Sequence, residues 1–201
     1  MATAALNHYS PEEYLALERN AEFKSEYIDG RIVAMTGASA AHAFITGNVH
    51  AELRARLRGG SCRAFVNDMR VQVEGGRRYT YPDVVAYCGE AQFLDGVSDT
   101  LTNPVLIVEV LSPSTEAYDR GDKFTHYRPM ETLQEYVLVA QDRPLAERFV
   151  RHGDSWMFSA FSGLDASLEL TSVACTIPLR EIYENVDLPA PPEPQPRGRS
   201  S

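Results

Sequence analysis

The spacing of apolar residues changes along this chain, and each spacing predicts a different kind of element. One segment repeats an apolar side chain every four residues, at Ile45, Val49, Leu53 and Leu57. This period predicts an amphipathic helix that Ser39 caps and the pair Gly59-Gly60 ends. A shorter helix is expected over residues 11–18, because Ser10-Pro11-Glu12-Glu13 supplies a capping hydroxyl, a proline at the first helical position and a glutamate at the third.

Most of the remaining apolar runs are typical of strands. Asp29-Gly30 separates two β-rich runs and predicts a tight hairpin. Further strands are expected over residues 62–66, 69–74, 83–87, 105–111, 135–140, 145–151 and 155–161. The run from Val105 to Leu111 is short and rich in Val, Ile and Leu, which predicts a central strand covered on both faces. The last two runs are expected to pair as a hairpin around His152-Gly153-Asp154.

Two more helices are expected in the second half of the chain. The first begins at Asp119 or Arg120 and ends at about Tyr127, because Pro129 cannot continue it. The second is short and begins near Pro178.

The order of these elements predicts the fold class. Helices, mixed strands and hairpins in this sequence predict a single α/β or α+β domain over residues 1–187, with a central mixed β-sheet flanked by helices. Prolines crowd the end of the chain, at positions 189, 191, 192, 194 and 196. They predict an extended, disordered tail over residues 188–201.

Charge is distributed unevenly over the 201 residues, whose formal net charge is −9. This balance argues against a protein that coats nucleic acid through overall positive charge, so any contact with nucleic acid must be local. Residues 52–78 hold seven arginines against three acids, whereas residues 81–119 hold seven acids and no Lys or Arg. The arrangement suits a phosphate-facing surface beside a cation site, and it equally suits two solvated faces.

The three cysteines, Cys62, Cys88 and Cys175, lie far apart and form no Cys-x-x-Cys motif. Neither a zinc site nor a disulfide framework is indicated, and reduced, buried cysteines are expected. The chain opens with no charged leader followed by an apolar run, and no apolar stretch approaches the roughly 20 residues that span a bilayer. A soluble, cytoplasmic protein without membrane contact is therefore expected.

The most informative residue is Glu109, because it interrupts the apolar run of a strand expected to be buried on both faces. A buried carboxylate needs a cation, a hydrogen-bond network or a metal ion, or it takes up a proton. Asp83 opens another expected strand, and two carboxylates on neighbouring strands suit Mg²⁺, which binds one or two carboxylates together with phosphate oxygens. The alternatives are an ion pair between Glu109 and Lys123 or an arginine, and a turn or capping role for Asp83.

Five motifs follow one another between residues 10 and 186. They are Glu26-Tyr27-Ile28-Asp29-Gly30, Tyr81-Pro82-Asp83-Val84-Val85, the segment from Val108 to Thr115, the segment from Asp119 to Tyr127, and Gln134-Glu135-Tyr136-Val137-Leu138-Val139. In this combination the chain resembles the Uma-type family, described as bacterial endonucleases, within the restriction-endonuclease-like superfamily. The core of that superfamily is a mixed sheet flanked by helices. In it, an aspartate opens one strand and a Glu-x-Lys motif lies on the next, and all converge on one or two Mg²⁺ ions.

The resemblance implies a role for each matching residue. Asp83 and Glu109 would be catalytic metal ligands, and the backbone carbonyl of Val110 would add a third ligand. The chain departs from the superfamily pattern at Leu111, which stands in the place of the lysine. The resemblance implies that Lys123, on the following helix, takes over its work of orienting or deprotonating water and steadying the phosphate charge. The alternative is a salt bridge from Lys123 to Glu109 in an inactive scaffold.

Three further residues are weaker candidates for the site. Glu26 would be an acid near the metal, His42 opens the long helix, and Tyr127 would donate a hydrogen bond into the site. For each, the favoured interpretation is structural: a solvent-exposed hairpin carboxylate, a histidine at a helix N-terminus and a packed tyrosine. Arginines 54, 56, 58, 70, 77 and 78 are candidates for holding phosphates.

Together these residues predict a Mg²⁺- or Mn²⁺-dependent endonuclease that hydrolyses phosphodiester bonds of DNA. A function of a different class stays open: a non-catalytic module that binds nucleic acid or protein and retains the nuclease fold, which Leu111 and the net charge favour. An RNA-directed or repair nuclease would differ only in substrate. Because cutting two strands calls for two sites, a symmetric homodimer is a further hypothesis, with the apolar hairpin near Trp156 as its contact.

Overall fold

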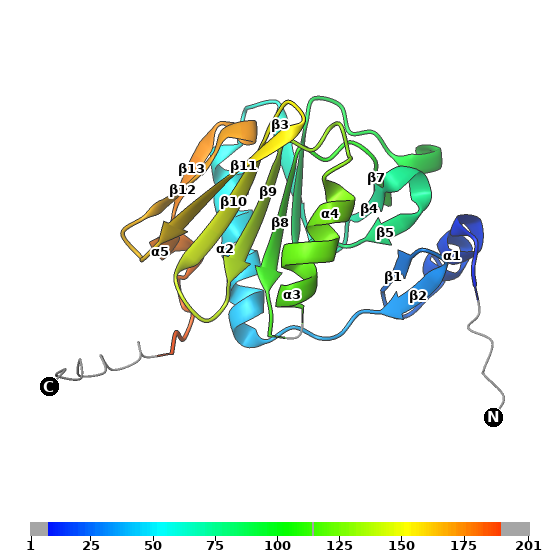
Figure 1. Ribbon diagram of the computed structural model, residues 1–201, viewed down its shortest axis with the longest axis horizontal. Helices are drawn as coiled ribbons and strands as arrows, with labels where there is room; N and C mark the ends of the chain where they lie inside the picture. The colour runs from blue at the N-terminus through cyan, green and yellow to red at the C-terminus, as the bar shows by residue number, and fades with distance from the viewer. Residues whose placement is uncertain (1–7, 114, 190–201) are drawn as a thin grey trace, which may run out of the picture.

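The computed structural model describes residues 8–113 and 115–189 and is built around a six-stranded β-sheet (Figure 1). Its strand order is β11-β10-β9-β8-β6-β3. The strands are β3 (Cys62–Val66), β6 (Val84–Cys88), β8 (Leu106–Leu111), β9 (Glu135–Ala140), β10 (Leu145–His152) and β11 (Ser155–Ser162). β8 and β9 run parallel and the other neighbours are antiparallel. The predicted central mixed sheet is thus confirmed.

β8 lies inside this sheet, and all six of its residues are buried. Val108 and Val110 belong to the apolar core on one face, whereas Ile107 and Leu111 belong to the core on the other. The prediction of a strand covered on both faces is confirmed. Because side chains alternate along a strand, Glu109 lies on the same face as Ile107 and Leu111.

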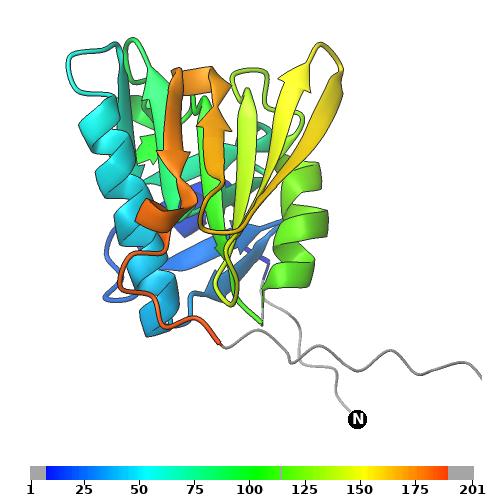
Figure 2. The ribbon, with the colours of Figure 1, turned by 90° about the vertical axis from the view of Figure 1, so that its left-hand side faces the viewer.

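Different elements cover the two faces (Figure 2). One face packs against α2 (Ala40–Arg56), β12 (Ser167–Leu170), β13 (Cys175–Pro178) and α5 (Leu179–Ile182). The other face packs against a second sheet and the helical segment that follows β8 (Figure 1). α2 is the predicted amphipathic helix: the Ser39 hydroxyl accepts the His42 N–H at its start, and Ile45, Val49 and Leu53 are fully buried.

The second sheet holds five short strands in the order β2-β1-β5-β4-β7. They are β1 (Ser25–Ile28), β2 (Arg31–Ala34), β4 (Arg70–Val73), β5 (Arg78–Thr80) and β7 (Thr100–Leu101). β1 and β2 form the predicted hairpin around Asp29-Gly30. α1 (Pro11–Glu18) begins with the predicted capping box at Ser10 and packs on this sheet through Tyr14, which stacks on Tyr27. Since only residues 81–83 separate β5 from β6, the second sheet leads directly into the first at Asp83.

The helix after β8 differs from the prediction. It begins earlier, with α3 (Glu116–Tyr118), and ends with α4 (Phe124–Tyr127), before Pro129 as predicted. Between them lies a π-helical turn, η3 (Asp119–Lys123). Asp119 and Lys123 stand at its two ends and are only 3% and 8% exposed. Isolated π turns are frequent at functional sites, and a short segment carries no period that would reveal one.

The expectation of three reduced cysteines is wrong. β3 and β6 pair so that Cys62 lies directly opposite Cys88, and the two form a disulfide with Cα atoms 3.9 Å apart. Cys175 is the free cysteine and is partly buried. The sequence separation of 26 residues carried no signal of this pairing, because strand register decides it.

Reduction of the disulfide is expected to lower the free energy of unfolding by about 3 kcal/mol, because the crosslink closes a loop of roughly 26 residues in the unfolded chain. Urea unfolding with and without dithiothreitol measures the difference. Cys62→Ala/Cys88→Ala should show the lower stability in both conditions, whereas Cys175→Ala should respond to reductant as the unaltered protein does. Equal stability of the oxidised and reduced protein would contradict the prediction.

Three expectations concern the ends and the surface of the chain. The predicted tail lies almost wholly outside the described residues, which end at Pro189. Within the described ranges, none of the helices combines the length and the apolar character needed to cross a membrane. The β10–β11 hairpin is present, with Met157 and Phe158 on its surface 58% and 53% exposed. Its use as a dimer contact stays a prediction.

Candidate functional site

Asp83 and Glu109 lie side by side, just before β6 and within β8. Val84 pairs with Val108 in the antiparallel ladder, so the next pair in register is Asp83 with Glu109, on one face of the sheet. The Val110 N–H donates to Oδ2 of Asp83 at 2.7 Å, which holds the aspartate against β8. The Glu109 side chain is 4% exposed and that of Asp83 17% exposed. The pair therefore joins a buried acid to one that solvent reaches.

Lys123 reaches this pair from the end of the π turn. Its Nζ lies 2.9 Å from Oε1 of Glu109 and 3.5 Å from Oδ1 of Asp119. Leu111, which occupies the place of the superfamily lysine, packs in the apolar core. The structure thus places the lysine beside the buried glutamate from the following helix, where the resemblance implied it. Whether Lys123 acts in catalysis stays a prediction.

The hydroxyl groups of one tyrosine and one threonine complete the surroundings of Glu109. The Tyr127 hydroxyl donates to Oε1 of Glu109 at 3.1 Å and shares a 2.8 Å hydrogen bond with Oγ1 of Thr80. Tyr127 is fully buried, so it packs in the core as the favoured interpretation expected. It also donates a hydrogen bond into the site, which that interpretation left out. Thr80 and Asp119 were not predicted. For Asp119 a signal existed, because it stands four residues before Lys123, whereas nothing in the sequence singles out Thr80.

The protonation of this cluster follows from its burial. Burial raises the pKa of Glu109 to about 8, although the positive charge of Lys123 opposes the rise, and the negative charges of Asp83 and Asp119 add to it. Burial by itself would lower the pKa of Lys123, but the charge of Glu109 outweighs it and the lysine pKa lies well above its usual value. The lysine is therefore charged, and the raised pKa of Glu109 means that a metal ion binding at this carboxyl competes with a proton.

His42, at the start of α2, belongs to the site. Its Nε2 lies 3.2 Å from Oδ2 of Asp83, and its Nδ1 lies 3.5 Å from Oγ1 of Thr46. Burial lowers the pKa of His42, but the hydrogen bond and charge of Asp83 outweigh it, so the pKa lies above the usual value. The favoured interpretation as a histidine at a helix N-terminus was therefore incomplete, because the helix delivers this imidazole to the aspartate.

Glu26 lies on the inner side of the β1–β2 hairpin. It is partly buried, and its Oε1 accepts the Tyr81 N–H at 3.2 Å. Its charge also raises the pKa values of Lys123 and Tyr127. The favoured interpretation of a carboxylate in solvent is wrong, because the second sheet folds the hairpin towards the Tyr81-Pro82-Asp83 segment.

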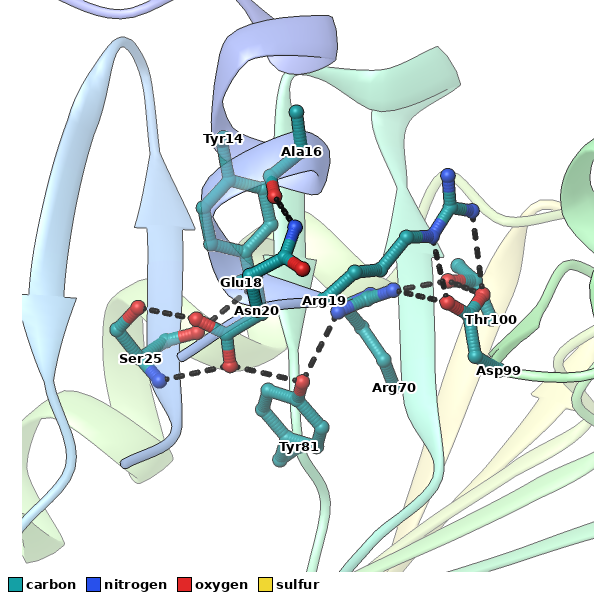
Figure 3. Close-up of polar contacts among 10 residues, drawn as sticks. All are labelled: Tyr14, Ala16, Glu18, Arg19, Asn20, Ser25, Arg70, Tyr81, Asp99 and Thr100. Carbon is teal, nitrogen blue, oxygen red and sulfur yellow. Dashed lines mark hydrogen bonds and ion pairs between the residues drawn. The ribbon is translucent and has the colours of Figure 1, made fainter. Parts of the chain in front are cut away.

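A buried polar network also holds the Tyr81-Pro82-Asp83 segment, through the hydroxyl of Tyr81 (Figure 3). The Tyr81 hydroxyl donates to Oε1 of Glu18 at 2.9 Å and accepts from Nη1 of Arg70 at 3.0 Å. Arg70 is 2% exposed and also binds Asp99 and Thr100, at 2.9 Å each. Arg70 is therefore committed to the interior and is removed from the candidates for phosphate contact. The network instead anchors the residue two positions before Asp83.

Both acids, Lys123, His42 and Asp119 line one pocket of about 580 Å³. Among the described residues no three His, Cys, Asp or Glu side chains converge as a ready metal site. The carboxylates of Asp83, Glu109 and Asp119 line this pocket as oxygen donors, and Val110 lines it too. This set fits Mg²⁺, which binds to proteins through one or two carboxylates and completes its shell with water and phosphate oxygens.

Comparisons with known proteins concern the family and the fold. The Uma2 family model, described as "Putative restriction endonuclease", matches residues 11–179. "Uncharacterized protein sll1609" and "Uncharacterized protein slr1290" of Synechocystis are each 36% identical to the chain, over 85% and 88% of its length and 97% and 92% of theirs. The crystal structure of a "putative nuclease belonging to DUF820" from Anabaena variabilis has a TM-score of 0.71 at 19% identity, and the match covers 87% of this chain and 97% of that one. The similarity to the crystal structure shows that the two proteins share a fold, a mixed sheet flanked by helices. The match of the family model over most of the chain shows that the protein belongs to the Uma2 family.

Proposed function

We propose that this protein is a divalent-cation-dependent endonuclease that hydrolyses phosphodiester bonds of DNA. The observation that carries the proposal is the arrangement at Glu109. A carboxylate inside a buried strand lies next to Asp83 and within 2.9 Å of the Lys123 ammonium, in a pocket open to a substrate. Its raised pKa adds support, because perturbed carboxyl groups in pockets are enriched at functional sites.

Each residue has a distinct part in this function. Asp83, Glu109 and the Val110 carbonyl would hold Mg²⁺ or Mn²⁺, which when bound polarises a phosphate oxygen and lowers the pKa of a water molecule. Lys123 orients the attacking water and balances the charge that builds on the phosphate. His42 fixes the orientation of Asp83, and Tyr127 does the same for Glu109 through its hydrogen bond. These two are positioning residues.

The position of the lysine is compatible with the proposal although β8 lacks the Glu-x-Lys motif. A lysine at Leu111 would stand in the apolar core that surrounds that residue. Lys123 instead enters the pocket from the helical segment and meets the same glutamate. The chemistry needs the ammonium near the carboxylates and the substrate, and it does not depend on which element supplies it.

A cation titration followed by thermal unfolding tests the proposal. At a cation concentration 100 times the dissociation constant, Mg²⁺ or Mn²⁺ is expected to stabilise the protein by about 2.7 kcal/mol. Asp83→Asn and Glu109→Gln should each abolish most of this gain. Glu135→Gln is the matched control, because Glu135 is a fully buried carboxylate of β9 that binds Thr171 and Ser172 away from the pocket.

Cleavage of supercoiled plasmid DNA is the second measurement. It is expected in Mg²⁺ or Mn²⁺ with the unaltered protein and with Glu135→Gln, and absent with Asp83→Asn or Glu109→Gln. If the cation stabilised both variants as much as the unaltered protein, and no nucleic acid were cleaved, the protein would be a non-catalytic module instead. If the protein cleaved RNA and not DNA, the assignment of the site would stand and the substrate would be RNA.

A further inference from the structure

A second groove, of about 720 Å³, runs between the C-terminal half of α2 and the edge strand β3. Three exposed arginines line it, Arg54 and Arg58 from the helix end and Arg63 from the strand. His50 lines it as well, and its ring lies 3.3 Å from the Ala64 carbonyl oxygen. The groove concentrates positive charge on a protein whose net charge is −9.

The arginine-rich segment 52–78 divides into two groups. Four of its arginines are ion-paired: Arg56 with Glu52 and Glu181, Arg70 with Asp99, and Arg77 and Arg78 with Asp29. The other three, Arg54, Arg58 and Arg63, form no ion pair with any described residue. Arg63 donates only to the carbonyls of Gly60 and Cys62. The three arginines without a carboxylate partner are the three that line the groove.

The groove lies next to the candidate active site. His42, Thr46, His50 and Arg54 follow one another at intervals of four residues along α2, and Arg58 stands at the same interval just past the end of the helix. His42 and Thr46 line the site pocket, whereas the last three line the groove. At 1.5 Å per residue, Arg54 lies about 18 Å from His42 along the helix.

Asp68 also joins the two cavities, because it lines both. It is the acid of the groove lining, and its Oδ1 is paired with Nζ of Lys24 at 2.6 Å. A ligand in the groove therefore meets three guanidinium groups that form no ion pair with a described carboxylate, beside one acid that Lys24 pairs.

We propose that Arg54, Arg58 and Arg63 bind the phosphate backbone of the same DNA duplex whose scissile bond lies at Asp83 and Glu109. The inference rests on the proposed function, because a polyanion long enough to reach both cavities is what a nuclease substrate supplies. A distance of about 18 Å corresponds to roughly five base pairs of duplex. The contacts are made with phosphates and carry no base sequence, so they position the duplex without selecting it.

Binding of a fluorescein-labelled 20-base-pair duplex, measured by anisotropy in EDTA, tests the groove separately from catalysis. Arg54→Gln/Arg58→Gln/Arg63→Gln is expected to raise the Kd at least tenfold. It should also reduce the slope of log Kd against log salt concentration by about two to three, since each lost phosphate contact contributes about 0.9. In Mg²⁺ the same variant should raise KM for cleavage and leave kcat within about twofold.

The matched control removes three exposed arginines elsewhere, in Arg31→Gln/Arg128→Gln/Arg143→Gln, and so changes net charge equally. Its Kd should stay within about threefold, because salt screens distant charges. An equal loss of affinity in both variants, or an unchanged Kd in the groove variant, would overturn the assignment. So would competition by polyglutamate as strong as that by DNA, which would identify an acidic protein segment as the ligand. If the unaltered protein cuts no DNA, the proposed function fails, while the anisotropy data still decide the groove.

Discussion

Replacing Lys123 with methionine is expected to lower the rate of DNA cleavage by at least about 100-fold. The substitution keeps the length of the side chain and removes the ammonium that lies 2.9 Å from Glu109. The carboxylates of Asp83 and Glu109 remain, so stabilisation by Mg²⁺ should persist. Plasmid cleavage and the cation-dependent thermal shift, measured on the same preparation, separate the two effects.

Lys24→Met is the control for this substitution. Lys24 lines the same pocket, but it is 40% exposed and pairs with Asp68 rather than with Glu109. Its loss should change the cleavage rate by less than tenfold. If Lys123→Met cleaved DNA as fast as the unaltered protein, Lys123 would be a structural partner of Glu109 only, and another group would have to act on the water.

The second large effect concerns stability without cation. At pH 9, Lys123→Met is expected to lower the free energy of unfolding by about 3–5 kcal/mol, because the buried Glu109 loses its cation and must either stay charged without a partner or take up a proton. The loss should be smaller at pH 6, where Glu109 can hold a proton. The direction of this pH dependence follows from the Glu109 pKa, which folding raises to about 8. Folding favours the protonated carboxyl, so the stability that Glu109 contributes is present at low pH and is lost as the pH rises through that value.

A double-mutant cycle measures this interaction. Lys123→Met/Glu109→Gln should recover most of the stability that Lys123→Met loses, since no charge is then left unpaired. Urea unfolding in EDTA gives the free energies of unfolding of the four proteins at pH 6 and again at pH 9. Lys24→Met removes an exposed ion pair and should lower the free energy of unfolding by at most about 1 kcal/mol. Additive effects of the two substitutions at pH 9 would show that Lys123 and Glu109 do not interact in the folded protein.

The elements of this fold were readable from the sequence where their causes are local. The capping box at Ser10 and the Asp29-Gly30 turn each depend on a few neighbouring residues, and both formed as predicted. The need of Glu109 for a partner was equally clear, because a carboxylate inside an apolar strand has a desolvation cost whatever surrounds it. Asp83 became a candidate mainly through its motif, since an aspartate after a proline is common in turns.

The partners of these residues depend on how distant segments meet. The disulfide between Cys62 and Cys88 exists because β3 and β6 pair in one register, and a shift of one residue would separate the two cysteines. Likewise, nothing local distinguishes Arg70, buried against Tyr81, from Arg54, exposed in the groove. Both are arginines on amphipathic elements, and their neighbours come from other parts of the chain.

The sequence by itself determined most of the helices and strands, the resemblance to the family and the buried acid of β8, because periodicity, turn chemistry and motif order are properties of the chain. The short strands β5, β7, β12 and β13 were not predicted. Only the tertiary structure decided that the π turn brings Lys123 to Glu109, that α2 brings His42 to Asp83, and that the arginines of one segment divide between ion pairs and a groove. The physical reason is that these contacts join residues on separate elements. Strand register and the packing of helices on the sheet set such distances, and no local pattern encodes them.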